Sequence, residues 1–379
     1  MSMKILALVL TFVALQAPVF AQATKTGGSS TGSGGSTSSS PPATVDPAKM
    51  MNRDLDTLHK MGRAGDRLTG NVTVTGGSVP WDPITVTVVC DGKEKYTTNT
   101  DGKGFFAINS VDDRGPNTVK ADPKPAGWQY LGCDVQAVLP GFNSSTLAIA
   151  NRGLTDSTNI GTIKLTREEN SGGSAVSSTT ASAPKDAAKA FEKARAAWLE
   201  NKPANAMKEL QKAVQEYPLF AEAWYQMGRL QEGSNPTEAA NVFRKAAEAD
   251  PRYVSPHVQL ALLASQGQKW QEVVDETKRA LDLDPRGTAL LWYYNALGNF
   301  QLNDMGVAES SATKALAMDP LHEQQNTEQL LAVVLVKKMD YAGALAHLKN
   351  CLTYFPPGPN LDLVKEQIAQ IEPAVKKPS

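Results

Sequence analysis

The residues that come closest to a chemical motif are His322 and Glu323, which begin a pattern similar to H-E-x-x-H. In that pattern two histidines one helical turn apart bind zinc, and the glutamate acts as the general base. Asn326 stands where the second histidine would be, so this zinc site is not formed. Outside the Gly/Ser-rich segments the sequence has no G-x-S-x-G nucleophile elbow, no G-x-x-x-x-G-K-[ST] phosphate loop and no metal-spaced Cys/His cluster. We therefore expect a protein that is not an enzyme and has no catalytic, metal or cofactor residues.

Composition narrows the class of protein further. The chain has 379 residues, which favours two or three domains, and 41% of them are hydrophobic, enough to form cores. Its 38 basic and 39 acidic residues give a net charge of -1, so we expect no nucleic-acid partner. Because no run of eighteen apolar residues follows the N-terminus, we also expect no transmembrane helix in the rest of the chain.

The N-terminus has the three-part pattern of a secretory signal peptide, residues 1–23. Lys4 precedes an apolar stretch over residues 5–15, and small residues follow before a polar segment. Cleavage after Ala21 or after Ala23 fits equally well, and an uncleaved membrane anchor is the alternative. The pattern predicts an exported protein that is periplasmic, at the cell surface or extracellular.

Export permits disulfides, and the sequence has three cysteines to consider. Cys90 and Cys133 lie in one β-rich region, so they are the obvious pair, with two buried free thiols as the alternative. Cys351 lies alone in a helical region.

Two segments have the composition of flexible linkers. Residues 24–45 are almost entirely Gly, Ser, Thr and Pro, and residues 168–185, the linking segment, are a shorter example. Such segments bury too little apolar area to offset the entropy lost on ordering. A short helix is expected at residues 46–62, where Asp46 can cap the first turn and Pro47 can occupy it. The parts on either side of the linking segment should fold independently.

Residues 67–167, the β block, show short strands separated by Gly, Pro, Asn and Asp. Apolar and polar residues alternate, as in strands with one buried face, and seven or eight strands at this spacing predict a β-sandwich of about 100 residues. The clearest alternation lies at residues 72–75, 84–88, 135–138 and 160–165. The turn Asp101-Gly102-Lys103-Gly104 should lead Phe105 and Phe106 into the next strand.

The order of motifs in the β block is similar to a known family. Residues 68–72, the strand ending at Cys90 and residues 98–105 resemble the carboxypeptidase regulatory-like domains, which are transthyretin-like sandwiches. This resemblance implies an accessory module. The zinc peptidase that sometimes accompanies it is not found elsewhere in the chain.

The second half of the chain repeats with a period of 33 to 36 residues, marked by Pro218, Pro251, Pro285, Pro320 and Pro356. Small residues stand five and twelve positions before each proline. Positions seven apart lie on one face of a helix, where small side chains allow another helix to pack closely. These positions are Ala206, Ala213, Ala239, Ala246, Val273, Ala280, Ala308, Ala315, Ala344 and Cys351.

Motifs such as Trp224-Tyr225-Gln226-Met227-Gly228 and the Asp-Pro turns make residues 186–372 similar to the tetratricopeptide repeat (TPR) family. The resemblance implies an all-α solenoid of five helix-turn-helix units following the all-β sandwich. Residues 360–371 read as a capping helix. Cys351 occupies a small-residue packing position, so we expect it to be buried and unreactive.

The resemblance also implies a concave groove lined by the first helix of each repeat, which would bind a partner peptide or helix. Cationic and amide groups there could bind an acidic segment or a C-terminal carboxylate. The alternative for each residue is a merely solvated helix face. Carried onto this sequence, the groove positions are Arg195, Tyr225, Arg229, Asn295, Asn299, Gln329 and Lys337.

The sequence therefore predicts an exported protein-protein interaction scaffold whose partner is a protein or peptide. One alternative is a carbohydrate-binding or adhesive sandwich with the repeats as a spacer, for which Trp81 and Trp128 are the aromatic candidates. Another is an accessory subunit of a separate secreted peptidase.

Overall fold

The computed structural model describes residues 67–75, 79–109, 133–149, 159–168, 172–320, 322, 324, 326–355 and 357–375. All of them belong to one compact unit, Gly62–Ser379. The expected signal peptide, the segment 24–45, the short helix at 46–62 and Trp128 lie outside the described residues. No helix among the described residues is both long and apolar enough to cross a membrane.

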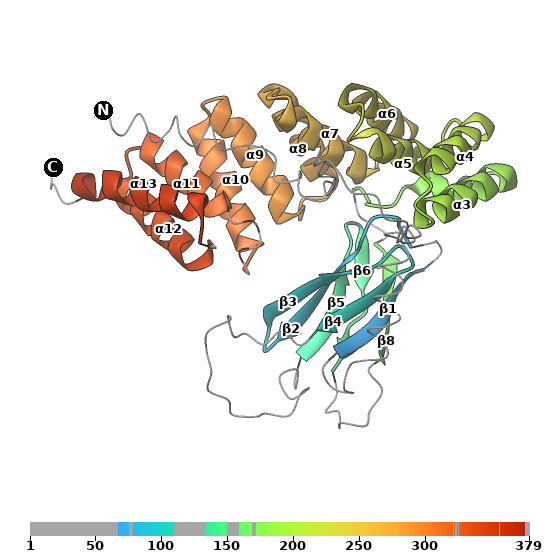
Figure 1. Cartoon of the computed structure of the whole chain (residues 1–379), viewed down its shortest axis with the longest axis horizontal. Coiled ribbons are helices and arrows are strands. Elements are labelled where there is room, and N and C mark those ends of the chain that lie inside the picture. The colour runs from blue at the N-terminus through green and yellow to red at the C-terminus, as the bar shows by residue number, and fades with distance from the viewer. Residues whose placement is uncertain are drawn as a thin grey trace, which may run out of the picture. The chain divides into compact units, whose positions relative to one another are not determined.

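The described part of the β block forms two four-stranded sheets, with strand orders β4-β1-β8-β6 and β3-β2-β5-β7 (Figure 1). Strands β1 and β8 pair in parallel, and the other pairs are antiparallel. The strands are β1 (Arg67–Val74), β2 (Thr85–Cys90), β3 (Lys93–Asn99), β4 (Phe105–Asn109), β5 (Cys133–Val138), β6 (Phe142–Ser144), β7 (Leu147–Ala148) and β8 (Asn159–Arg167).

Side chains of both sheets belong to one buried cluster. Val72 and Ile163 come from one sheet, and Val88 and Val135 come from the other. In β5 the buried and exposed side chains alternate, which is the period-2 pattern that predicted a strand there. The cluster thus explains why the apolar positions of the β block recur at every second residue.

Cys90 and Cys133 form a disulfide, which confirms the predicted pairing. The two residues lie directly opposite each other in the β2–β5 ladder. The bond closes a loop with a sequence separation of 43 residues, which restricts the unfolded chain.

The predicted turn before Phe105 is also present. Asp101 Oδ1 accepts hydrogen bonds from the backbone N–H groups of Lys103, at 2.8 Å, and Phe105, at 2.9 Å. Gly104 has a φ of 86°, and a Cβ there would lie 2.4 Å from the Val72 carbonyl oxygen, so only glycine fits. The turn leads Phe106 into the core, where 1% of its surface is exposed.

The C-terminal half is a solenoid of helices that stack in chain order (Figure 1). The closest contacts are within the pairs α3/α4, α5/α6, α7/α8, α9/α10 and α11/α12, and α13 packs on α12, as expected for five repeats and a cap. The helices are α3 (Lys185–Leu199), α4 (Pro203–Glu216), α5 (Ala221–Gln231), α6 (Pro236–Ala249), α7 (Val254–Gln266), α8 (Trp270–Leu283), α9 (Ala289–Gln301), α10 (Met305–Ala317), α11 (Asn326–Lys337), α12 (Tyr341–Tyr354) and α13 (Pro359–Val375).

The ten small residues that set the repeat register are all completely buried. They lie on the second helix of each pair, where the first helix approaches too closely for larger side chains. Cys351 is one of them and is a free, buried cysteine, as predicted. Burial raises the pKa of its thiol to about 12.

Four of the five pairs turn from the first helix to the second through a residue in the left-handed backbone region. The φ angles are 57° at Asn201, 53° at Gln268, 66° at Asn303 and 68° at Met339. The next residue's N–H donates to a carbonyl five positions back, which closes the helix end. Glycine usually occupies such a position, so the repeats tolerate some backbone strain here.

The linking segment differs from its prediction as a flexible tether. In its described part, residues 172–184, the backbone of Ser174 pairs with that of Tyr253 in an isolated parallel β-bridge. The 3-10 helix η3 (Ser178–Ser182) packs on α5. Asp250 Oδ2 accepts hydrogen bonds from Ser177 Oγ at 2.7 Å and Ser178 N at 2.8 Å. Serine hydroxyls paired with a carboxylate fix this segment despite its low apolar content.

Candidate functional site

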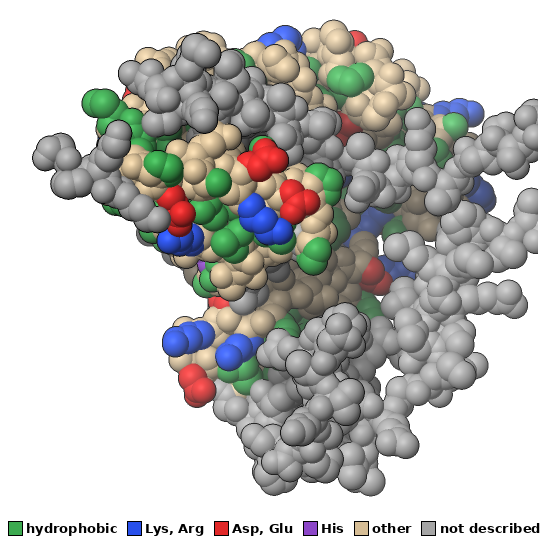
Figure 2. All heavy atoms as spheres, turned by 60° about the vertical axis from the view of Figure 1, so that its left-hand side comes forward, with side chains coloured by type: hydrophobic (Ala, Val, Ile, Leu, Met, Phe, Trp, Pro, Cys, Tyr) green, Lys and Arg blue, Asp and Glu red, His purple; other side chains and the backbone are tan. Residues whose placement is uncertain are grey.

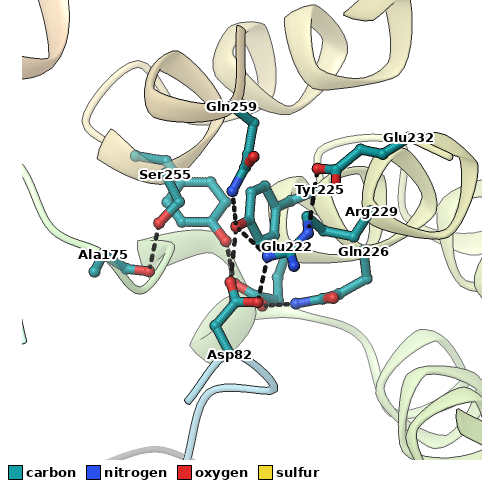
Figure 3. A network of polar contacts seen from close by, with 10 residues as sticks. Asp82, Ala175, Glu222, Tyr225, Gln226, Arg229, Glu232, Ser255 and Gln259 are labelled. Atoms are coloured by element: carbon teal, nitrogen blue, oxygen red, sulfur yellow. Dashed lines mark hydrogen bonds and ion pairs between the residues drawn. The ribbon is translucent and has the colours of Figure 1, made fainter. Parts of the chain in front are cut away.

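A loop of the β block, residues 79–84, lies against the first helices of the solenoid and presents Asp82 to them (Figure 3). Tyr225 Oη donates a hydrogen bond to Asp82 Oδ2 at 2.7 Å, and Arg229 Nη1 donates one to Asp82 Oδ1 at 2.6 Å. Tyr225 and Arg229 are one turn apart on α5, so their polar ends meet at the same point. Two predicted groove residues therefore bind a carboxylate, which belongs to the same chain.

The surroundings keep Tyr225 protonated and Arg229 charged. Burial, followed by the charge of Asp82, raises the pKa of Tyr225 well above its ordinary value. For Arg229, burial lowers the pKa, but Tyr225, Asp82 and Glu232 outweigh it and the net pKa is raised. Both side chains thus remain hydrogen-bond donors at neutral pH, as a carboxylate site requires.

Glu222, one turn before Gln226 on α5, is a buried acid beneath this site (Figure 3). Its two carboxyl oxygens accept hydrogen bonds from Gln226 Nε2 at 3.0 Å and Tyr253 Oη at 2.8 Å. Its pKa is raised to about 7, mainly by burial and in smaller part by the negative charge of Asp82, although the two hydrogen bonds lower it. Near neutral pH, Glu222 is therefore close to half protonated.

A second pair of contacts joins the β block to α3. Arg195 Nη2 donates a hydrogen bond to the backbone carbonyl of Gly102, in the turn before β4. Trp81, beside Asp82, has 9% of its surface exposed and belongs to the core of the first repeat. Its ring centroid lies 5.2 Å from that of Phe191. These contacts join the β block to the first repeat, while independent folding of the two parts stays a prediction.

The other groove positions are placed differently from the prediction. Asn295 is buried between two helices, since its Nδ2 donates to Thr277 Oγ1 at 2.9 Å and its Oδ1 accepts from Ser311 Oγ at 2.8 Å. Asn299 donates back to the Asn295 carbonyl at 2.8 Å. These two asparagines pack helices together and do not line an open groove.

Gln329 is likewise buried, and its Nε2 donates to Gln367 Oε1 on α13 at 3.0 Å. This hydrogen bond therefore joins the capping helix α13 to α11. Lys337 ends α11 and is half-buried. Figure 2 turns forward the side of the molecule on which Figure 1 shows α11–α13, and acidic, basic and hydrophobic side chains are mixed on this face.

The structure thus brings Tyr225 and Arg229 together at Asp82 and places Arg195 against Gly102. Asp82 and Glu222 are site residues that the sequence did not identify. Asp82 follows a tryptophan and precedes a proline in a loop, a setting with no repeat or alternation. Glu222 stands in the first turn of a helix, where acids are common for helix-dipole reasons. The only available signal was the position of Glu222 in the repeat, one turn before the groove position of Tyr225.

The described residues contain no group of three or more His, Cys, Asp or Glu that could hold a metal ion. His322 contacts Glu328 at 3.8 Å and stacks on Tyr354, with ring centroids 3.7 Å apart. The region similar to a zinc-binding motif is therefore part of the packing around α11. What the Asp82 region offers is carboxylate recognition by a tyrosine and an arginine.

No family model and no curated protein matches this chain. Its helical half is similar to a number of solved structures, of which three are examples. These are MamA from Desulfovibrio magneticus RS-1, YrrB, which is described as a TPR protein with an unusual peptide-binding site, and PilF from Pseudomonas aeruginosa. Identities are 17%, 18% and 15%, with TM-scores of 0.41, 0.43 and 0.39. The matches cover 45%, 48% and 51% of this chain and 96%, 91% and 91% of the others. The role of this chain must therefore be inferred from its own site.

Proposed function

We propose that this protein is an exported, non-enzymatic scaffold that binds protein or peptide partners through its helical repeats. In this proposal residues 1–23 are a signal peptide, and the β block is a sandwich of the carboxypeptidase regulatory-like kind that serves as an accessory module. The presence of a disulfide supports export, because disulfides persist in oxidising compartments.

One observation carries the proposal: Tyr225 and Arg229 hold the carboxylate of Asp82 on the face predicted to bind partners. The ion pair between Arg229 and Asp82 is partly open to solvent, with 36% and 35% of the two side chains exposed. A partner carboxylate can therefore reach the same donors when Asp82 moves away. We infer that an acidic segment or C-terminus of the partner replaces Asp82.

The adhesive alternative has less support. Trp81 packs inside the first repeat against Phe191 instead of standing on the surface, so it is not available to stack on a sugar ring. Trp128 lies outside the described residues, and no observation favours an accessory role for a separate peptidase.

The test is capture of partners from the native envelope with the full chain and three variants. Arg229→Glu should lose the partner, because it replaces a hydrogen-bonded cation with a repelling charge; the expected cost is on the order of 2 kcal/mol or about 30-fold in affinity. Asp82→Ala should increase recovery, since it removes the internal competitor. Arg244→Glu is the matched control, because Arg244 is also a partly exposed arginine in an ion pair, with Glu272, but lies on the second helices.

Circular dichroism of each variant must first show an intact helical fold. Equal recovery of the same partners by wild type and Arg229→Glu would contradict the proposal, as would full recovery by the β block alone.

A further inference from the structure

A cavity of about 480 Å³ lies where the β block, the linking segment and the first helices of the solenoid meet. Phe142 lines it from β6, Val176 from the linking segment and Phe191 from α3. Its volume is within the range of pockets that hold small molecules, and such pockets are common at junctions between structural units. Asp82 and its two donors on α5 do not line this cavity, so it is a second candidate site.

Four aromatic side chains line the cavity, namely Trp81, Phe142, Phe191 and Phe220. The ring centroids of Trp81 and Phe191 lie 5.2 Å apart, and those of Phe191 and Phe220 lie 4.8 Å apart. Excluding water from such walls around an apolar ligand is favourable, and aromatic rings gain further free energy by packing on one another in tilted or offset arrangements. The walls therefore favour a ligand that contains an aromatic ring.

The charged residues of the wall balance one another, since they are two arginines, Arg167 and Arg252, and two glutamates, Glu192 and Glu222. Each arginine donates a hydrogen bond at 3.0 Å to a backbone carbonyl of the linking segment, and Arg252 has a further contact. Glu222 accepts hydrogen bonds on both carboxyl oxygens. A charged ligand would lose its hydration here without gaining an unbalanced opposite charge, which is unfavourable for anions and cations alike. The wall therefore favours an uncharged ligand.

Two of the lining residues each carry a buried polar atom that has no hydrogen-bond partner in the described part of the chain. These atoms are Trp81 Nε1 and Thr180 Oγ1, and only 9% of the surface of Trp81 is exposed. Nearly all buried polar groups in folded proteins are hydrogen-bonded, so an unpaired one in a cavity wall points to a missing partner. Because an indole N–H can only donate, the partner of Trp81 must be an acceptor. An oxygen atom of a ligand would supply it, whereas a pure hydrocarbon would not.

We propose that this cavity binds an uncharged aromatic compound that carries an oxygen acceptor. Its ring packs among Phe142, Phe191 and Phe220, and its oxygen accepts a hydrogen bond from Trp81 Nε1. The hydroxyl of Thr180, which can donate and accept, is the second polar group available to it. This adds a small-molecule ligand to the proposed protein-binding scaffold. Since the ligand would contact the β block, the linking segment and the solenoid at once, its binding would also hold these three parts together.

The experiment is equilibrium dialysis of the disulfide-bonded full chain against four naphthalene compounds of nearly the same shape. The probe 2-acetylnaphthalene is uncharged and has a carbonyl acceptor, and 2-isopropenylnaphthalene has a methylene group in place of that oxygen. The other two probes, 2-naphthoate and 2-naphthamidinium, are an anion and a cation.

We expect one molecule of 2-acetylnaphthalene to bind per chain. The isopropenyl compound should bind about fivefold more weakly because it leaves the indole N–H unpaired, and each ion about tenfold more weakly because its charge is desolvated. No saturable binding of 2-acetylnaphthalene, or equal or tighter binding of either ion, would overturn the proposal. Equal binding of the isopropenyl compound would refute the role of the oxygen acceptor.

Two kinds of variant locate the binding. Ala188→Trp fills the cavity from α3 and should abolish binding of 2-acetylnaphthalene, whereas Ala204→Trp, at an exposed position of α4 outside this cavity, should not. Trp81→Phe removes the indole N–H, so the preference for the acetyl over the isopropenyl compound should disappear while both bind more weakly to the smaller wall. Unaltered binding by Ala188→Trp, in a variant that retains the wild-type melting temperature, would place the ligand elsewhere. An unchanged preference in Trp81→Phe would refute the hydrogen bond from Trp81.

Discussion

Replacing the buried acid Glu222 with glutamine should remove a large part of the pH dependence of stability. The folded-state pKa of Glu222 is about 7, against an ordinary value of 4.5, and 6% of the residue is exposed. Because the pKa is raised on folding, the unfolded chain loses this proton first as the pH increases. Stability is therefore greatest below the unfolded-state pKa and falls as the pH rises through 7.

The magnitude follows from the difference of 7 - 4.5 = 2.5 pH units. At about 1.4 kcal/mol per unit, the total is about 3 to 4 kcal/mol, most of which is lost between pH 5 and pH 8. In the Glu222→Gln variant the amide oxygen can still accept from Tyr253, and Gln226 can turn its own amide to accept in return. The hydrogen bonds are thus retained while the titrating proton is removed.

The assay is urea unfolding of both proteins at pH 5 and pH 8, followed by helical circular dichroism. Wild type should lose about 2 to 3 kcal/mol more than Glu222→Gln over this range, because the other ionisable groups are common to both. Glu309→Gln, which changes a partly exposed acid on α10, is the control and should follow wild type. Parallel losses in wild type and Glu222→Gln would show that Glu222 is not buried as an acid in the folded protein.

Three further predictions concern the solenoid and the linking segment. Met339→Gly should stabilise the fold by about 1 kcal/mol in urea unfolding, because Met339 has a φ of 68° and is 73% exposed; destabilisation would show that its side chain packs. Cys351 should react with Ellman's reagent only after denaturation, since burial raises its pKa to about 12, and rapid labelling of the native protein would contradict this. Asp250→Ala should expose residues 172–184 to limited proteolysis, whereas Asp284→Ala, at the same position of the next repeat, should not; equal cleavage of both would refute the fixed segment.

The solenoid could be predicted because its information is local and repeated. Ala213 and Ala280 stand at equal distances before prolines, and each is buried for the same packing reason as its counterparts in the other repeats. The disulfide was predictable in a similar way, since only two of the three cysteines lie in one β-rich region. In both cases the constraint can be read within a short stretch of sequence.

The site was predicted only in part because its contacts join residues far apart in the sequence. Arg229 was identified from its repeat position, but its partner Asp82 lies 147 positions away in a loop without periodicity. The prediction of a flexible linking segment failed for a related reason. The composition of this segment shows that it has no core of its own, but not that it packs on other parts of the chain. Gly173 nevertheless fits where a Cβ would lie 2.7 Å from Leu283 Cβ, so its lack of a side chain allows close packing.

The two kinds of contact made by the Asp82 loop differ in strength, and this difference bears on the proposed exchange of carboxylates. An ion pair with both partners about one-third exposed contributes about 0 to 1 kcal/mol, so a partner can displace Asp82 from Arg229 at little cost. Trp81, by contrast, is part of the aromatic core of the first repeat. Burial of its large apolar surface stabilises the contact by more free energy than the ion pair does. The β block can therefore stay attached through Trp81 while Asp82 leaves its donors. The proposed competition between Asp82 and an acidic partner requires this combination of a weakly held carboxylate and a firmly packed loop.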